Sequence, residues 1–333
     1  MEAKFECGTI IKGIDLKGLP LCKILSEDMC MRDYQYEVGM NEDVNPLAVE
    51  GSCKEGLYFT LAGDICRFLK YGTKLALVSV ADEEDVYVDV MKFRTHRLEI
   101  REIIPLSDVR AWEWMAQNGA DICTGNGEVF THVVCNGYWD AVKFLSEHGA
   151  DARADDNFAL EFAAESGRLD VVKILVGHGA DVTANDSRAV RSAARNGHLD
   201  VVKFLMKNGV DVTGCDNYAV RVAAANGHLD VVKYLVEKGA DVTDADNYAI
   251  LHASYNGYLD IVEFLVEHGA DVKANNGYAA ELAADNGHLE ILKFLVEHGT
   301  DVNVFGNRAI GIANRKGHED VVKFLQEKGV AMS

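Results

Sequence analysis

The chain has 333 residues, 48% of them hydrophobic, and a formal net charge of −20 at pH 7. This charge disfavours nucleic acids and anionic membrane surfaces as partners, because both carry the same sign. No apolar run approaches the length of a membrane span, and residues 1–6 show no basic start of a secretion signal. The eight cysteines have no paired spacing, which is typical of reduced thiols in an intracellular protein.

Residues 1–105 predict a small α+β domain of ordinary size. Residues 1–50 have no clear period, and we expect a turn at Asn45-Pro46 and a loop at residues 51–56. Alternation and β-branched or aromatic residues predict the strands, and apolar residues on one side predict a helix. The expected strands are 57–60, 75–80, 86–90 and 98–103, and the expected helix is 64–71, which ends at Gly72.

Several short motifs between residues 28 and 104 form a recognisable series. They are Tyr-Gln-Tyr-Glu-Val-Gly (34–39), Cys-Lys-Glu-Gly-Leu-Tyr-Phe-Thr (53–60), Phe-Leu-Lys-Tyr-Gly (68–72) and Lys-Phe (92–93) before a final strand. The series resembles the amino-terminal domain of ankyrin-repeat proteins of giant, mimivirus-like viruses. A related small domain of unknown function occurs in phage proteins. The resemblance implies a viral origin and brings no established activity.

Tyr58 has a second interpretation. The segment Gly-Leu-Tyr-Phe (56–59), followed by a helix and a strand, is also similar to ADP-ribosyltransferases. That resemblance implies that Tyr58 stacks on nicotinamide and that Glu99 or Glu102 stabilises developing charge. The amino-terminal domain would then be catalytic, with the repeats recruiting its substrate.

The same family holds the ribose with a His on an earlier strand. Residues 31–36, at the corresponding place, contain no His, and His96 follows the Tyr58 strand. We therefore expect Tyr58 and Phe59 to be ordinary strand residues on opposite faces, and we expect no catalytic residue.

A half-repeat is predicted directly after this domain. Ser107-Asp108 supplies an N-cap for a helix over residues 109–118, and residues 119–121 (Gly-Ala-Asp) match the end of later repeats. The first helix of this repeat is missing. Trp112 and Trp114 are either an exposed aromatic anchor or the filling of the seam between domain and array, and we favour the second because large aromatics bury the most area.

From there one unit recurs every 30 residues, which indicates stacked copies of one supersecondary motif. In one copy, helix one is predicted over residues 187–195 and helix two over residues 199–207, with Leu205 facing the core and Lys203 facing solvent. The turn glycines are Gly137, Gly167, Gly197, Gly227, Gly257, Gly287 and Gly317.

The motif Gly-His-Leu-Asp-Val-Val-Lys-Phe-Leu (197–205), followed by Gly-Val-Asp-Val (209–212), resembles the ankyrin repeat, over residues 107–330. The family's usual period is 33, with a Thr-Pro-Leu-His segment opening helix one. Here that segment is absent and the period is 30, so we expect shortened hairpin fingers. The residues near its place, expected to act as caps, are Asn157, Asn217, Asn247 and Asn307.

These patterns predict an α+β amino-terminal domain followed by an all-α ankyrin-repeat solenoid. The expected domains are residues 1–105 and 106–330, the second made of a half-repeat (107–120) and seven repeats (121–330). Glu319 and Gln326 replace apolar residues of earlier copies, so we expect the last repeat to cap the array and no effector domain to follow it.

The histidines recur singly, in two columns of the repeat. Metal sites need clustered ligands, so we expect turn and helix-end residues, and no metal or other cofactor. No phosphate-binding loop and no nucleophile–base motif is present, which favours a non-enzyme. The two columns are His198, His228, His288 and His318, and His148, His178, His268 and His298.

Helix one carries four variable positions, at i, i+3, i+4 and i+7, while its alanine columns stay fixed. They form one helix face, which is either simply solvated or a concave protein-binding surface. Arg and Tyr are frequent at binding hot spots, and a basic island here favours an acidic or phosphorylated protein segment as partner. The candidate binding residues are Phe158, Arg188, Arg191, Arg195, Tyr218, Arg221, Tyr248, Tyr255, Tyr278, Arg308 and Arg315.

The expected function is that of a monomeric scaffold that binds a host or viral protein, and the resemblance implies that the scaffold itself is viral. We expect it in the host-cell cytoplasm, with the nucleus and the virion left open, and a structural role in the virion is a further alternative.

Overall fold

The computed structural model describes residues 5–31, 34–43, 56–123 and 127–331, apart from the side chains of residues 214–216. The chain divides into two compact units, Met1–Asp155 and Asp156–Ser333. The expected turn at Asn45-Pro46 and most of the expected loop at residues 51–56 lie outside the described residues. No described helix has the length and apolar character needed to span a membrane.

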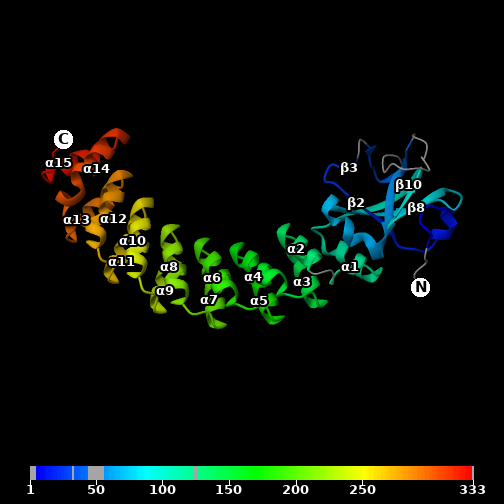
Figure 1. Ribbon diagram of the computed structural model, residues 1–333, viewed down its shortest axis with the longest axis horizontal. Helices are drawn as coiled ribbons and strands as arrows, with labels where there is room; N and C mark the ends of the chain where they lie inside the picture. The colour runs from blue at the N-terminus through cyan, green and yellow to red at the C-terminus, as the bar shows by residue number, and fades with distance from the viewer. Residues whose placement is uncertain (1–4, 32–33, 44–55, 124–126, 332–333) are drawn as a thin grey trace. The chain divides into compact units, whose positions relative to one another are not determined.

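The first unit contains an antiparallel sheet of eight strands in the order β1-β8-β9-β6-β2-β7-β10-β5 (Figure 1). The expected strands correspond to β6, β7, β8 and β10, so the α+β class is confirmed. A separate hairpin joins β3 (Cys30–Met31) to β4 (Tyr34–Gln35). The sheet strands are β1 (Ile10–Lys12), β2 (Leu21–Leu25), β5 (Gly39–Glu42), β6 (Leu57–Leu61), β7 (Lys74–Ser79), β8 (Asp85–Asp89), β9 (Lys92–Thr95) and β10 (Arg97–Pro105).

Strand β2, which the sequence did not predict, lies at the centre of this sheet between β6 and β7. All five of its residues are buried, so it lacks the alternation that marks a half-exposed strand. Lys23 in its middle is only 4% exposed, and its Nζ donates to the Tyr58 carbonyl oxygen at 2.8 Å. This partnered lysine made the strand look like a polar segment.

The half-repeat helix α1 (Val109–Gln117) begins as predicted, because the Asp108 side chain accepts a hydrogen bond from the Arg110 N–H. Trp112 is fully buried and donates from Nε1 to the Leu106 carbonyl oxygen at 2.7 Å, whereas Trp114 is half-buried. The Trp112 side chain is therefore part of the buried core and is not an exposed aromatic anchor.

The 3₁₀ helix η2 (Ala62–Tyr71) of the sheet region contacts both α1 and α2 (Glu128–Cys135). Within the array, the first helix of a repeat contacts the second helix of the same repeat and the first helix of the next repeat. The contacts of η2 with α1 and with α2 correspond to these two. Helix η2 therefore takes the place of the missing first helix of the half-repeat.

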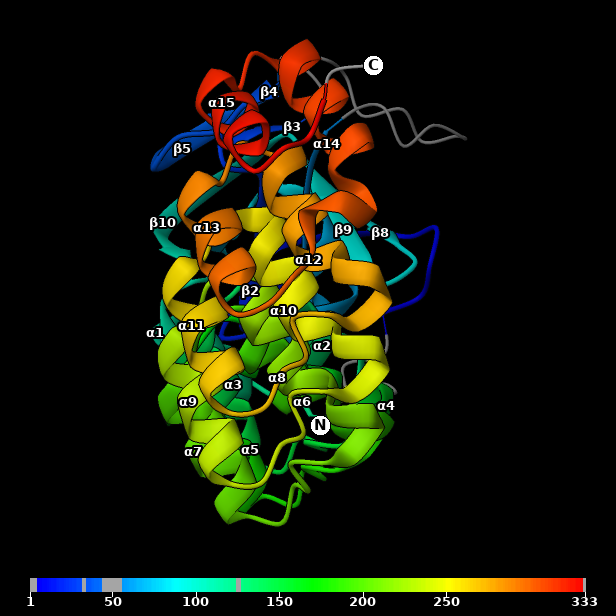
Figure 2. The same cartoon turned by 90° about the vertical axis from the view of Figure 1, so that its left-hand side faces the viewer.

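Seven antiparallel helix pairs follow α1 in the described residues, and no strand occurs there after β10. In the second unit the first helices form one row and the second helices another (Figure 2). The pairs are α2 and α3 (Trp139–Glu147), α4 (Ala154–Glu165) and α5 (Leu169–Gly177), α6 (Ala184–Arg195) and α7 (Leu199–Lys207), α8 (Gly214–Ala225) and α9 (Leu229–Glu237), α10 (Asp244–Asn256) and α11 (Leu259–Glu267), α12 (Ala274–Asp285) and α13 (Leu289–Glu297), and α14 (Val302–Lys316) and α15 (Glu319–Glu327).

Three residues with left-handed backbone conformation occupy the place where we expected shortened hairpin fingers. Asn185, Asp186 and Ser187 have φ of 50°, 56° and 57°, and residues 245–247 and 275–277 behave alike. Asn, Asp and Gly tolerate this conformation best, and they fill most of these positions, with Ser187 and Ala245 as exceptions.

The asparagines expected as helix caps have another role. Asn157 and Asn247 accept through Oδ1 from the N–H of Asp181 and Asp271, at 2.7 and 2.8 Å, and Asn217 does the same for the corresponding loop residue. Each such bond spans 24 residues and ties one repeat to the next. The prediction for Asn307 was also wrong, because it lies inside α14, whose N-cap is Asp301.

The core positions of helix two generate a stability prediction. Leu205 is 0% exposed and Lys203 is exposed. We expect Leu205→Ala to lower the free energy of unfolding by about 2–5 kcal/mol. Lys203→Ala removes one exposed cation–π contact with Tyr234 and should lower it by no more than about 1 kcal/mol. Urea melts of both variants provide the measurement, and equal effects would contradict the assigned faces.

The loop aspartates generate a pH prediction. The Thr243 hydroxyl, followed by the Thr243 N–H, holds the pKa of Asp241 below its usual value. A pKa lowered by folding contributes stability above the unfolded-state pKa of about 3.9, and this stability is lost as the pH falls through the folded-state pKa. We therefore expect Asp241→Asn to destabilise the protein at pH 7 and to flatten the acid side of its stability profile.

Urea midpoints at a series of pH values from neutral to acid test this expectation. The control is Glu237→Gln, which removes an exposed carboxylate at the end of α9. Parallel profiles for Asp241→Asn and the unaltered protein would contradict the role given to the Thr243 hydrogen bonds.

Candidate functional site

The first helices, α4 to α14, form the inner side of the bend of the second unit (Figure 1). The variable residues of these helices make up one surface along this row. We call this surface the helix-one face. Opposite it, alanines such as Ala189, Ala193 and Ala194 are buried between helices. The exposed candidates are Arg188, Arg195, Tyr255, Tyr278, Arg308 and Arg315, and the half-buried ones are Phe158, Arg191, Tyr218, Arg221 and Tyr248.

Tyr218 on α8 brings three of these arginines together. The guanidinium groups of Arg191 and Arg221 lie 5.2 and 5.3 Å from its ring centre. Its hydroxyl oxygen accepts a hydrogen bond from Nη2 of Arg195 at 2.8 Å. The positive charges of two neighbouring repeats therefore gather around one aromatic ring, an arrangement stabilised by cation–π attraction.

A second tyrosine extends the arrangement by one repeat. The Arg221 guanidinium also lies 5.3 Å from the ring centre of Tyr248, whose ring stacks on His252 at 3.9 Å. We call Arg191, Tyr218, Arg221 and Tyr248 the Arg–Tyr ladder.

The arginines of the face differ in how their charge is balanced. Arg188 pairs through Nε with Glu161 Oε1 at 2.7 Å, and Arg308 pairs with Glu281. Within the described part of the chain, Arg191, Arg195 and Arg221 form no ion pair. The expected basic island is thus partly neutralised at Arg188 and keeps its net charge around Tyr218.

The two ion pairs follow a rule that the sequence contains. In each, the carboxylate precedes the arginine by 27 residues, from one helix one to the next. This pairing was not predicted from the sequence. Comparing each variable position with the next repeat would have found it.

A hollow of about 280 Å³ lies beside the ladder, between α4, α6 and α8. Its charge is mixed, because two carboxylates share it with three arginines. Its lining residues are Glu161, Glu165, Arg188, Arg191, Ser192, Arg195 and Tyr218.

The part of the face on α12 carries two carboxylates. Burial raises the pKa of Glu281 and of Asp285 above the usual values, although Arg308 opposes the shift at both. Glu281 is 8% exposed. Glu281 is paired with Arg308, so the charge in this part of the face is balanced, as it is at Arg188.

The histidine columns have contacts within the array. The ring nitrogens Nε2 of His198, His228 and His288 each lie 2.9 Å from a carbonyl oxygen of the previous repeat. The His228 ring also covers the preceding turn, where a Cβ added to Gly197 would come within 2.5 Å of Nδ1. These rings therefore join neighbouring turns. Among the residues that the structure describes, no group of three side chains able to hold a metal comes together.

The second histidine column lies at the ends of the second helices. Each Nδ1 there lies 2.7 or 2.8 Å from the carbonyl oxygen four residues earlier, which occupies one of the last free acceptors of the helix. This contact is found at His148, His178, His268 and His298.

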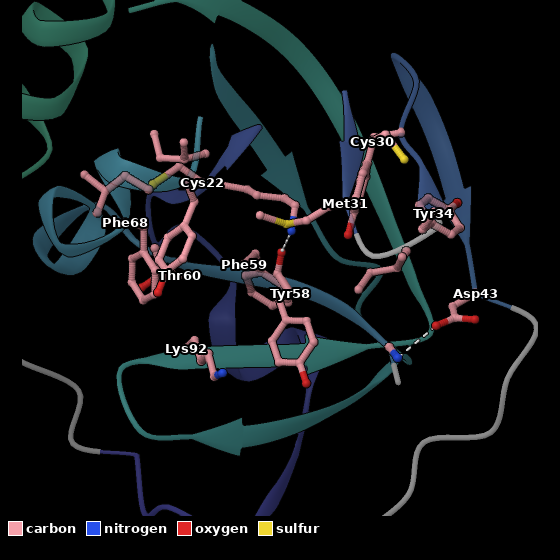
Figure 3. A pocket seen from close by; sticks show the side chains of 17 residues that line it. Cys22, Cys30, Met31, Tyr34, Asp43, Tyr58, Phe59, Thr60, Phe68 and Lys92 are labelled. Carbon is pink, nitrogen blue, oxygen red and sulfur yellow. Dashed lines mark hydrogen bonds between the residues drawn. The ribbon is translucent and has the colours of Figure 1, made fainter. Parts of the chain in front are cut away.

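Tyr58 lines a separate hollow of about 430 Å³ in the sheet region, with aromatic, sulfur-containing and lysine side chains around it (Figure 3). Lys92 Nζ lies 4.6 Å from the Tyr58 ring centre. Neither Glu99 nor Glu102 lines this hollow, since both belong to β10, which β2 and β7 separate from β6. The arrangement implied by the ADP-ribosyltransferase resemblance is therefore not formed there.

Comparison with protein families matches the model of ankyrin repeats (3 copies) to residues 108–186, 190–276 and 274–333, more than half of the chain. An ankyrin repeat protein of Acanthamoeba polyphaga mimivirus is 30% identical over 121 residues, or 33% of this chain. The match covers 39% of that relative, so the chain spans about two fifths of its length.

The ladder generates a stability prediction. Arg221 contacts two tyrosine rings, and each such contact is worth about 0.5–1 kcal/mol at an exposed site. We expect Arg221→Ala to lower the free energy of unfolding by about 1–2 kcal/mol. The matched control, Arg315→Ala, removes an exposed arginine of the same face, and its effect should stay below about 0.5 kcal/mol in urea melts. Equal losses would show that the ring contacts contribute nothing.

Proposed function

The chain belongs to the ankyrin-repeat family, and we propose that it is a viral scaffold that binds a protein through the helix-one face. Ankyrin repeats are protein–protein interaction modules, and the mimivirus relative suggests the viral origin. The partner proposed is a host or viral protein that a monomeric chain meets inside the host cell.

The observation that carries this proposal is the cluster of Arg191, Arg195 and Arg221 around Tyr218. These side chains lack ion pairs in the described residues, although the chain as a whole has a net charge of −20. A protein this acidic has many carboxylates that could neutralise them, so three uncompensated arginines favour an external anion as partner. Arginine grips carboxylates and phosphates in bidentate fashion, which supports an acidic or phosphorylated protein segment.

Several features of the face support binding over simple solvation. Its side chains differ from copy to copy while the buried columns stay constant. Tyr255 and Tyr278, on the first helices α10 and α12, are 47% and 37% exposed, so the face also offers large aromatic rings to a partner. Tyrosine and arginine are the residue types that most often dominate interface energies.

The experiment compares two double variants after a partner has been found by pull-down from host-cell lysate. Arg191→Glu/Arg221→Glu reverses two charges of the helix-one face. Lys203→Glu/Lys233→Glu makes the same change in net charge on exposed positions of the second helices. We expect the first pair to weaken binding by about a hundredfold or more, as for two hot-spot residues, and the second to leave it nearly unchanged.

Circular dichroism and urea melts establish that both double variants remain folded. If the helix-two pair weakens binding as much as the helix-one pair, only bulk charge matters and the proposed face is wrong. Repeating the pull-down with the partner treated by phosphatase shows whether phosphate contributes.

A further inference from the structure

We propose that the Arg–Tyr ladder selects an extended segment carrying two anionic groups three residues apart. This inference rests on the proposed function and specifies the partner of the same face. One anion would lie at Arg191 and Arg195, the two arginines of α6 that contact Tyr218, and the other at Arg221 of α8.

The spacing follows from the geometry of stacked helices. The helices α6 and α8 pack against each other, and packed helices lie about 8–10 Å apart. A segment in the polyproline-II conformation advances about 3.1 Å per residue with three residues per turn, so three residues cover one repeat and return the side chain to the same side. Side chains at positions i and i+3 of the segment can therefore reach the arginines of successive repeats, whereas adjacent positions cannot.

The ladder holds its arginines in place before anything binds. The Nε atoms of Arg191 and Arg221 are buried and form no hydrogen bond in the described structure, because tyrosine rings lie beside both groups. Nη2 of Arg191 donates to the Asn185 carbonyl oxygen at 3.0 Å. Side chains already held by such contacts lose less conformational entropy on binding, which favours recognition of a defined spacing.

The neighbouring charges limit the site to two anions. On one side Glu161 neutralises Arg188 and Glu165 lines the same hollow. On the other side Glu281 neutralises Arg308. A longer run of negative charge would meet arginines that are already paired at both ends.

The test uses short fluorescein-labelled Gly-Ser peptides with the full chain, read by fluorescence anisotropy. Three peptides carry two phosphoserines each, at i and i+3, at i and i+1, or at i and i+6, so that their total charge is equal. In a fourth, glutamates replace the phosphoserines at i and i+3. Measurements at about 0.15 M salt confine electrostatic effects to roughly 8 Å, so distant carboxylates contribute little.

We expect the i, i+3 phosphopeptide to bind at least about tenfold more tightly than the other two, as two simultaneous contacts allow. The glutamate peptide distinguishes the source of the anion: comparable binding indicates an acidic sequence, and much weaker binding indicates phosphorylation. Equal affinities for the three phosphopeptides, no binding of any of them, or tighter binding of a thymidine oligonucleotide would overturn the inference.

Variants separate this inference from the proposed function. Arg221→Gln should abolish the preference for the i, i+3 spacing, whereas Lys233→Gln, on the second helix of the same repeat, should keep it. If the pull-down partner is lost in Arg191→Glu/Arg221→Glu but no spacing preference exists, the binding face stands and the paired-anion inference fails. If neither effect is seen, both fail.

Discussion

The whole array depends on the fact that a single repeat cannot bury its apolar side chains alone. Ala193, Ala194 and Leu205 are buried only because the neighbouring helix pairs cover them. Two polar contacts fix how neighbours are placed: the His ring over the preceding turn and the Asn bond to the next loop. These contacts keep equivalent positions of successive repeats side by side, which explains the constant period of 30 residues.

The same constraint requires that both ends of the array be covered. At one end η2 contacts α1 and α2, so a helix from the sheet region fills the place of a repeat helix. At the other end Glu319 and Gln326 are exposed where equivalent residues of earlier repeats are apolar and half-buried. The amino-terminal end is covered by tertiary packing, whereas the carboxy-terminal end is made soluble by polar residues. Only the polar residues could be recognised in the sequence.

The helices of the array could be predicted because the same pattern of apolar and polar residues recurs every 30 residues in several copies. The sheet region offers each pattern once, and β2 and β9 were missed since one is buried throughout and the other is only four residues long. The expected caps at Asn157 and Asn247 failed for a different reason. An asparagine before a helix usually bonds within its own turn, but the left-handed backbone here directs Oδ1 towards the next repeat.

At the candidate site the sequence identified which residues share a face, because helical spacing determines that directly. It could not say which arginines are neutralised, since that depends on contacts between side chains 27 residues apart. This distinction changes the physical interpretation of the surface. An isolated charge on an exposed face contributes little to affinity, whereas three arginines around Tyr218 present several donors in a fixed arrangement. On a chain of net charge −20, such a cluster attracts anions only at short range, so it favours selectivity for a matching segment over indiscriminate binding.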